Sequence, residues 1–196
     1  YNLGVVYQKI HHTNLALECY QKAISFLHAY PTAHNNLGII FLENDQIRSA
    51  VKSFEWAIAY SPNYSQAHNN LGSALQQINQ FENAKLHFEK AISIDPSYAQ
   101  AFENLGVVCE ILNLPAEAID NFKRALKINP NLTNSYRNLS RLKTFSEKDQ
   151  EIGMMQSLYS KEDLNQERIA LERALARIAE LEKQLDCLDT ELRKRN

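Results

Sequence analysis

NNLGIIFLENDQIRSAVKSFEWAIAYSPNYSQAH, residues 35–68, is followed at once by NNLGSALQQINQFENAKLHFEKAISIDPSYAQAF, residues 69–102. The leucines that follow the paired asparagines, Leu37 and Leu71, lie 34 positions apart (71 minus 37). The same interval relates the leucines along the chain, which are Leu3, Leu37, Leu71, Leu105 and Leu139. A fixed period of this size predicts a solenoid of stacked helical units.

Small and bulky residues repeat with these leucines. Glycines lie at 4, 38, 72 and 106, aromatic residues at 20, 54, 88 and 122, and alanines at 16, 50, 84 and 118 and at 23, 57, 91 and 125. Two antiparallel helices approach closely only where small residues meet, and bulky residues must fill the remaining space. Prolines at 62, 96 and 130 fall where the second helix of each pair should stop. The pattern therefore predicts an all-α chain of paired helices.

The expected helices follow from these columns. First helices are expected near residues 1–11, 31–44, 65–78, 99–112 and 133–144, and second helices near 14–27, 47–60, 81–94 and 115–128. Over about residues 1–143 the columns closely resemble the tetratricopeptide repeat (TPR) family, and we assign the repeat array, about four repeats and a half repeat, to residues 1–145. The resemblance implies a right-handed superhelical solenoid, a protein-binding role without a cofactor, and a concave groove lined by the first helices.

One polar residue type precedes every repeated leucine. The five asparagines are Asn2, Asn36, Asn70, Asn104 and Asn138. Each amide offers a donor and an acceptor, so a regular row can pair with the peptide groups of an extended chain of any sequence. The row resembles the asparagine ladder in the repeat region of O-linked N-acetylglucosamine transferases. The alternative is an internal role, in which these side chains cap or bridge neighbouring repeats.

The neighbours of this ladder predict a neutral groove with a basic end. The neutral residues are Asn35, Asn69, Gln66 and Gln100, and the basic ones are Arg137 and Arg141. Family members that bind chaperone tails clamp a carboxylate with lysines and an arginine. The matching positions here hold no cation, because they are Tyr1, Val5, Asn36, Gln66 and Asn70. Binding of chaperone tails is therefore disfavoured.

Two further helices are expected after the repeats. Residues 146–160 are predicted to form a capping helix, and residues 161–196 a long helix with coiled-coil spacing. Its oligomerisation residues are Leu171, Ile178, Leu181, Leu185, Leu188 and Leu192. This helix would pair with a second copy or fold back onto the solenoid. Residues 141–171 are weakly similar to the connector of bacterial TPR-sulfotransferase proteins, whose catalytic domain would lie further along.

Several classes of function are disfavoured by composition and motifs. A formal net charge of −2 gives no basic field for nucleic acid, and no apolar run approaches the roughly 20 residues that span a bilayer. The 3 cysteines are odd in number and far apart, which fits a reducing, cytoplasmic setting. The 6 histidines show no metal-ligand spacing, and phosphate-loop and nucleophile-elbow motifs are missing. We expect neither a metal site nor an enzyme, and the chain is expected to lack an N-terminal part.

The sequence thus supports a scaffold that binds an extended peptide segment in its concave groove through the asparagine ladder. A homo-oligomer through the C-terminal helix is possible in this hypothesis. The alternative is a substrate-recruiting, non-catalytic part of a larger glycosyl- or sulfotransferase. A third hypothesis is a spacer whose groove is filled by a neighbouring copy.

Overall fold

The computed structural model describes residues 1–142, and within them the chain forms nine helices and no strand. The helices are α1 (Asn2–Lys9), α2 (Thr13–Phe26), α3 (Pro31–Glu43), α4 (Ile47–Tyr60), α5 (Ser65–Gln77), α6 (Phe81–Ile94), α7 (Ala99–Ile111), α8 (Pro115–Ile128) and α9 (Thr133–Leu142). Each bound lies within two residues of the sequence prediction. The expected capping helix, the long helix and its oligomerisation residues lie outside the described residues.

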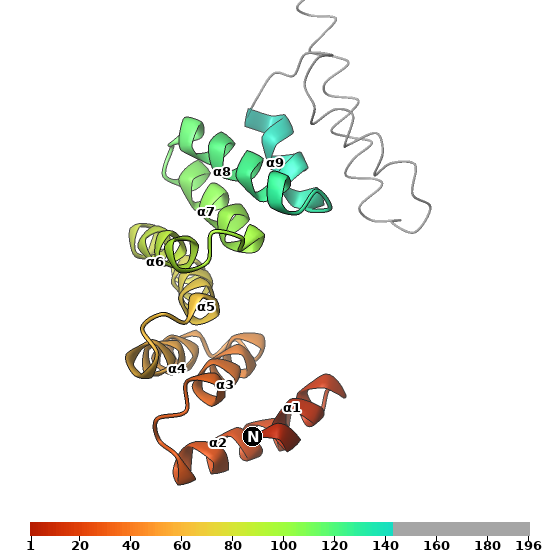
Figure 1. Ribbon diagram of the computed structural model, residues 1–196, viewed down its shortest axis with the longest axis vertical. Helices are drawn as coiled ribbons and strands as arrows, with labels where there is room; N and C mark the ends of the chain where they lie inside the picture. Colours follow the sequence, from red (N-terminus) through yellow and green to blue (C-terminus); the bar gives the residue numbers. More distant parts are fainter. Residues whose placement is uncertain (143–196) are drawn as a thin grey trace, which may run out of the picture.

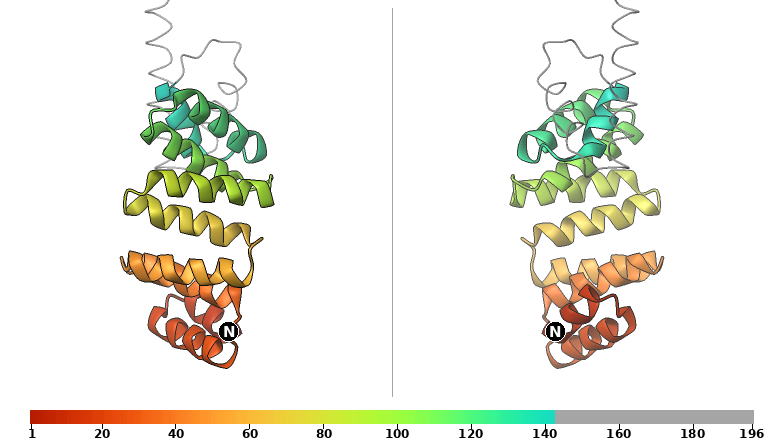
Figure 2. Two further views of the ribbon diagram at one scale, coloured as in Figure 1. Left: turned by 90° about the vertical axis from the view of Figure 1, so that its left-hand side faces the viewer. Right: turned by 90° about the vertical axis from the view of Figure 1, so that its right-hand side faces the viewer.

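Consecutive helices form four antiparallel hairpins that stack in chain order, with α9 packed on the last of them (Figures 1 and 2). The first helices of successive hairpins, α3, α5, α7 and α9, also contact one another. Figure 1 shows the stack as a curve with these helices on its inner side and α2, α4 and α6 on its outer side. The predicted all-α solenoid is therefore confirmed over the described residues.

Close contact between glycine and an aromatic ring holds each hairpin together. A Cβ atom placed on Gly38 would lie 2.5 Å from Cε1 of Phe54, and one on Gly72 would lie 2.7 Å from Cε1 of Phe88. Both rings are fully buried, as are the alanines of the two alanine columns on α4 and α6. The repeat of small and bulky residues thus acts through direct contact of a ring with the backbone of the facing helix.

The turn between the two helices of each hairpin repeats as closely as the helices do. The residues with positive φ are His11, Asp45, Asn79 and Asn113, at 59°, 58°, 60° and 58°. The next backbone N–H bonds a carbonyl five residues back, for example Gln46 N to Phe41 O at 2.8 Å. This left-handed ending is a common helix stop, and asparagine and aspartate tolerate it better than most residues. Histidine, which stands at the first turn, is also enriched in this conformation.

Candidate functional site

The five ladder asparagines lie on the first helices α1, α3, α5, α7 and α9, one on each. These helices form the inner side of the curved stack (Figure 1). Asn2 is exposed, whereas Asn36, Asn70, Asn104 and Asn138 are half-buried. Their amides are thus partly accessible and partly packed within the structure.

Hydrogen bonds between side chains link the ladder from one hairpin to the next. Nδ2 of Asn70 donates to Oδ1 of Asn35 at 3.0 Å, and Nδ2 of Asn104 donates to Oδ1 of Asn69 at 2.9 Å. Both acceptors are buried, with exposed fractions of 4% for Asn35 and 5% for Asn69. The internal role, which the sequence offered as an alternative to ligand contact, is therefore performed by these bonds. The two buried asparagines, Asn35 and Asn69, thus fix the orientation of the ladder amides that donate to them.

The bonds run in one direction through the stack. Asn69 donates to Oδ1 of Asn70 at 3.5 Å, and Asn35 donates to Oδ1 of Asn36 at 3.4 Å. Together with the bonds between hairpins, they form a chain of donors and acceptors from Asn104 to Asn36. Hydrogen bonds in such a chain polarise one another and strengthen. Every central ladder amide is consequently held with its nitrogen toward the preceding hairpin.

Two tyrosines that the sequence analysis did not select end this chain at the first hairpin. Nδ2 of Asn36 lies 3.2 Å from the hydroxyl oxygens of both Tyr1 and Tyr20, and the Tyr20 hydroxyl donates to Oε1 of Gln8 at 2.9 Å. Burial, the largest cause, raises the pKa of the Tyr20 phenol, so it stays protonated and able to donate. Tyr1 stands one repeat before Asn35, at the equivalent position, and this equivalence is the sequence feature that could have identified it as part of the site.

A carboxylate replaces the amide acceptor at the last junction. Glu103 stands in the column of Asn35 and Asn69, is 6% exposed, and accepts bonds from Gln100 Nε2 at 3.0 Å and Ser135 Oγ at 2.5 Å. Ser135 is fully buried and stands where the preceding repeats have Ala33, Ala67 and Ala101. The hydroxyl thus accompanies the carboxylate, because a buried charge needs donors. The sequence analysis missed this pair.

The remaining predicted site residues are exposed side chains on α5, α7 and α9. Arg141 is held by Glu110, whose carboxylate oxygens lie 2.9 and 3.1 Å from its Nη2, and it also contacts Oδ1 of Asn138 at 3.1 Å. Arg137 is exposed and bonds Asn134. Gln100 donates to Oδ1 of Asn104 at 3.1 Å, and Gln66 is exposed. The basic end is therefore partly neutralised by Glu110.

Two histidines, His68, which is buried, and His87, which is half-buried, form a pair within the third hairpin. The rings of His68 on α5 and His87 on α6 stack with centroids 5.3 Å apart, and their Nδ1 atoms are 3.1 Å apart. Nε2 of His68 lies 3.1 Å from the carbonyl oxygen of Pro62, which can only accept, so this nitrogen carries a proton. No group of three or more metal-ligating side chains occurs among residues 1–142. The two rings pack against each other between α5 and α6.

This pair predicts a loss of stability in mild acid. Burial, the largest cause, lowers the pKa of both imidazoles, so the folded protein binds fewer protons than the unfolded chain. The free energy of unfolding should therefore fall as the pH drops below about 6.5, the ordinary pKa of histidine. Urea unfolding at pH 7.5 and 5.5 measures this fall. A variant with His68→Phe and His87→Asn, the residues of the next hairpin, should show a smaller fall, and an equal fall would contradict the assignment.

Family models recognise the repeats directly. The description "Tetratricopeptide repeat" matches residues 65–98 and 99–132 with one model, and residues 1–26 with another. The second hairpin, α3 and α4, shares the same columns and contacts. No curated protein sequence matches the chain significantly. None of the helices within residues 1–142 combines the length and apolar character needed to cross a membrane.

Solved structures of low sequence identity share the fold. MamA 41-end from Desulfovibrio magneticus RS-1 is 17% identical with a TM-score of 0.67, covering 94% of this chain and 94% of that one. YrrB, described as a TPR protein with an unusual peptide-binding site, is 17% identical with a TM-score of 0.66, covering 89% of each. The first TPR of Spaghetti (RPAP3), bound to the HSP90 peptide SRMEEVD, is 19% identical with a TM-score of 0.56, covering 57% of this chain and 89% of that one.

Proposed function

Because this chain carries tetratricopeptide repeats, we propose that it is a protein-interaction scaffold that binds an extended peptide segment along its inner side. The ladder asparagines Asn36, Asn70 and Asn104 would make the central contacts. Asn2, Asn138 and the exposed residues Gln66, Gln100 and Arg137 would extend the contact toward the two ends. Two relatives in fold, YrrB and the Spaghetti TPR, are described as peptide-binding or peptide-bound, which supports a similar use here.

The observation that carries the proposal is the spare hydrogen-bonding capacity of the fixed amide of Asn70 at the centre of the ladder. An asparagine side chain has two N–H donors and an oxygen with two lone pairs. The bond from Asn70 to Asn35 uses one donor, and the bond from Asn69 uses one lone pair. One donor and one lone pair remain on a half-buried side chain that its neighbours already orient. Such preorganisation lowers the entropic cost of binding.

An extended peptide fits this arrangement chemically. Its backbone offers an N–H and a C=O at each residue, whatever the side chains are. Since Asn36, Asn70 and Asn104 are held with their nitrogens toward the preceding hairpin, all three would present the same polarity to a ligand. We infer that the bound segment runs in one direction along the stack, with its sequence preference set at the ends near Arg137.

Replacing one ladder amide tests this proposal. Peptides selected from a phage-displayed library of random dodecapeptides provide the probe, and fluorescence anisotropy gives the Kd. Asn70→Ala should weaken binding about two- to tenfold, the usual worth of one neutral hydrogen bond. N-methylation of alternate peptide bonds in the same sequence should weaken binding as well, because it removes backbone donors.

Asn35→Ala is the matched control for this measurement. It removes the buried partner of Asn70 and leaves the ladder amide in place. Both variants lose the bond between hairpins, so both should be destabilised by urea unfolding, whereas only Asn70→Ala should lose a ligand contact. Equal affinities for the two variants, together with tolerance of N-methylation, would show that the ladder has only the internal role.

Oligomerisation and a link to a transferase remain separate proposals. The seven-residue spacing of Leu171, Ile178, Leu185 and Leu192 supports self-association of the scaffold, which would multiply affinity through linked sites. The likeness of the ladder and its NNLG strings to glycosyltransferase repeats supports the alternative of a substrate-recruiting part. Light scattering of the chain with and without residues 172–196 tests the first, and the gene sequence downstream of Asn196 tests the second.

A further inference from the structure

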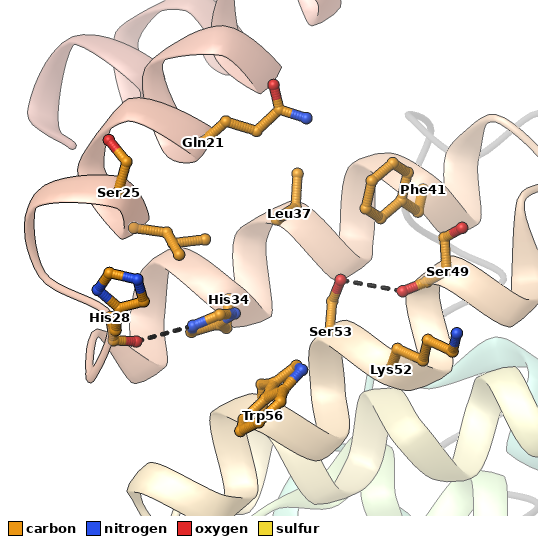
Figure 3. Close-up of a pocket in the computed structure, with 11 residues that line it drawn as sticks. Gln21, Ser25, His28, His34, Leu37, Phe41, Ser49, Lys52, Ser53 and Trp56 are labelled. Carbon is orange, nitrogen blue, oxygen red and sulfur yellow. Dashed lines mark hydrogen bonds between the residues drawn. The ribbon is translucent and has the colours of Figure 1, made fainter.

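A pocket lies between the second helices α2 and α4 (Figure 3). These two helices are on the outer side of the curved stack, whereas the ladder asparagines belong to the first helices on its inner side (Figure 1). The volume of the pocket is about 420 Å³. Ile24 from α2, Leu37 and Phe41 from α3, and Trp56 from α4 supply the apolar walls. Figure 3 shows the Trp56 indole close to His34 at one end, with Phe41 and Ser49 toward the other. An open apolar pocket of this size accommodates a large side chain.

A small residue, Ser53, stands in the wall of this pocket. Ser53 lines it and turns its hydroxyl onto the carbonyl oxygen of Ser49 at 2.9 Å. One repeat later the same position holds His87, which stacks on His68, and two repeats later it holds Asn121, which is buried. Both of these side chains are larger than the serine. Only the first of the three junctions between second helices has a serine there.

An aromatic wall continues from the pocket to the surface. The rings of Trp56 and Tyr60 stack with centroids 5.7 Å apart and planes 19° apart, and the Tyr60 ring lies 5.6 Å from that of His34. The Trp56 side chain is 53% exposed although it is large and mainly apolar. Exposed aromatic residues of this kind are typical anchors of protein interfaces.

The charge around the pocket selects its occupant. Among the described residues that line it, Lys52 is cationic and none carries a carboxylate. At the matching positions of the next two junctions, Gln21 is replaced by Glu55 and Glu89, and Lys52 by Leu86 and Asp120. An anionic ligand would meet repulsion there and attraction here. Lys52 and the apolar walls thus complement an acidic segment that carries an aromatic residue.

We propose that the pocket between α2 and α4 is a second docking site, which takes an aromatic side chain from an acidic segment of a partner protein. The aromatic ring enters between Ile24 and Trp56, while a neighbouring carboxylate pairs with Lys52. The site is separate from the asparagine ladder, so the two faces of the solenoid can hold two different polypeptide segments at once.

Trp56 is the single tryptophan of the chain and therefore reports on the pocket. The probe is a capped pentapeptide of sequence Asp-Glu-Phe-Glu-Asp at pH 7.5. Its binding should give a saturable blue shift of tryptophan emission, because an exposed indole becomes covered. Capped Ser-Asn-Phe-Asn-Ser should bind more weakly, and Lys-Arg-Phe-Arg-Lys weakest of all. Absence of a saturable shift, or equal binding of the acidic and basic peptides, would overturn the proposal.

Two substitutions copied from the next hairpin locate the binding. Ser53→His places a larger side chain in the pocket wall and should weaken binding of the acidic peptide at least tenfold, as checked by anisotropy of a labelled peptide. Lys52→Leu should weaken it about two- to fivefold, the usual range for an exposed ion pair, and reduce the preference over the neutral peptide. Asn70→Ala should leave this binding unchanged. Undiminished binding by both pocket variants, or loss with Asn70→Ala, would overturn the proposal.

Discussion

Phe88→Ala should lower the free energy of unfolding by about 3–5 kcal/mol, the largest effect expected of a single substitution described here. The Phe88 ring is fully buried and belongs to the main hydrophobic cluster of the described residues. Its edge rests on the backbone of α5, where a Cβ on Gly72 would come within 2.7 Å. Removal of the ring leaves a void between α5 and α6, which are in contact with each other. Urea unfolding followed by circular dichroism measures the loss.

Leu86→Ala on the same helix is the matched control. Leu86 is 62% exposed, so its truncation removes little buried surface and should change stability by no more than about 0.5 kcal/mol. The two substitutions delete apolar groups from α6 and differ mainly in burial. A loss below about 1 kcal/mol for Phe88→Ala would mean that the ring does not support the hairpin as the structure indicates.

Gly38→Ala should destabilise the protein by about 1–3 kcal/mol, although alanine normally favours a helix over glycine by about 1 kcal/mol. The new Cβ would lie 2.5 Å from Cε1 of Phe54, and that ring is fully buried and has no room to withdraw. The steric cost therefore exceeds the gain in helix propensity. Thermal unfolding provides the measurement, and a rise in Tm for Gly38→Ala would refute the steric argument.

A second substitution separates the steric effect from other causes. Gly38→Ala should destabilise a protein that already carries Phe54→Leu by less than it destabilises the unsubstituted protein, because the smaller leucine leaves space for the new methyl group. Gly4→Ala in the first hairpin should cost less than Gly38→Ala, since its Cβ would lie 2.9 Å from Cε1 of Tyr20. Equal losses at the two glycines would point to helix geometry as the cause.

The helices could be predicted from the sequence because their packing repeats with the chain. The contact that Gly38 makes with an aromatic ring recurs at Gly72, one repeat later, so the repeat interval alone indicates which residues face each other. The turn residues were missed for a different reason. Their left-handed conformation accompanies a hydrogen bond from the next N–H to a carbonyl five residues earlier, and the residue type at a position such as His11 does not reveal this bond.

The candidate site was predictable in position and less so in its bonding. The ladder column was visible, whereas the pairing of Asn70 with Asn35 joins residues 35 positions apart (70 minus 35), one more than the repeat. That offset arises from how neighbouring first helices sit against each other, which composition does not reveal. Glu103 was not predicted as a site residue for the same reason, because its partner Ser135 lies 32 positions on (135 minus 103).

The bond between hairpins, with Asn70 or Asn104 as donor and Asn35 or Asn69 as acceptor, has the same form at both central junctions. A deletion of residues 65–98, one whole repeat, would bring Asn104 opposite Asn35, and their two amides could form the same bond that Asn70 and Asn35 form now. The middle of the array can therefore change length by whole units over evolution without a mismatch. Its last junction cannot, because Glu103 requires Ser135, so α7 and α9 must be inherited together.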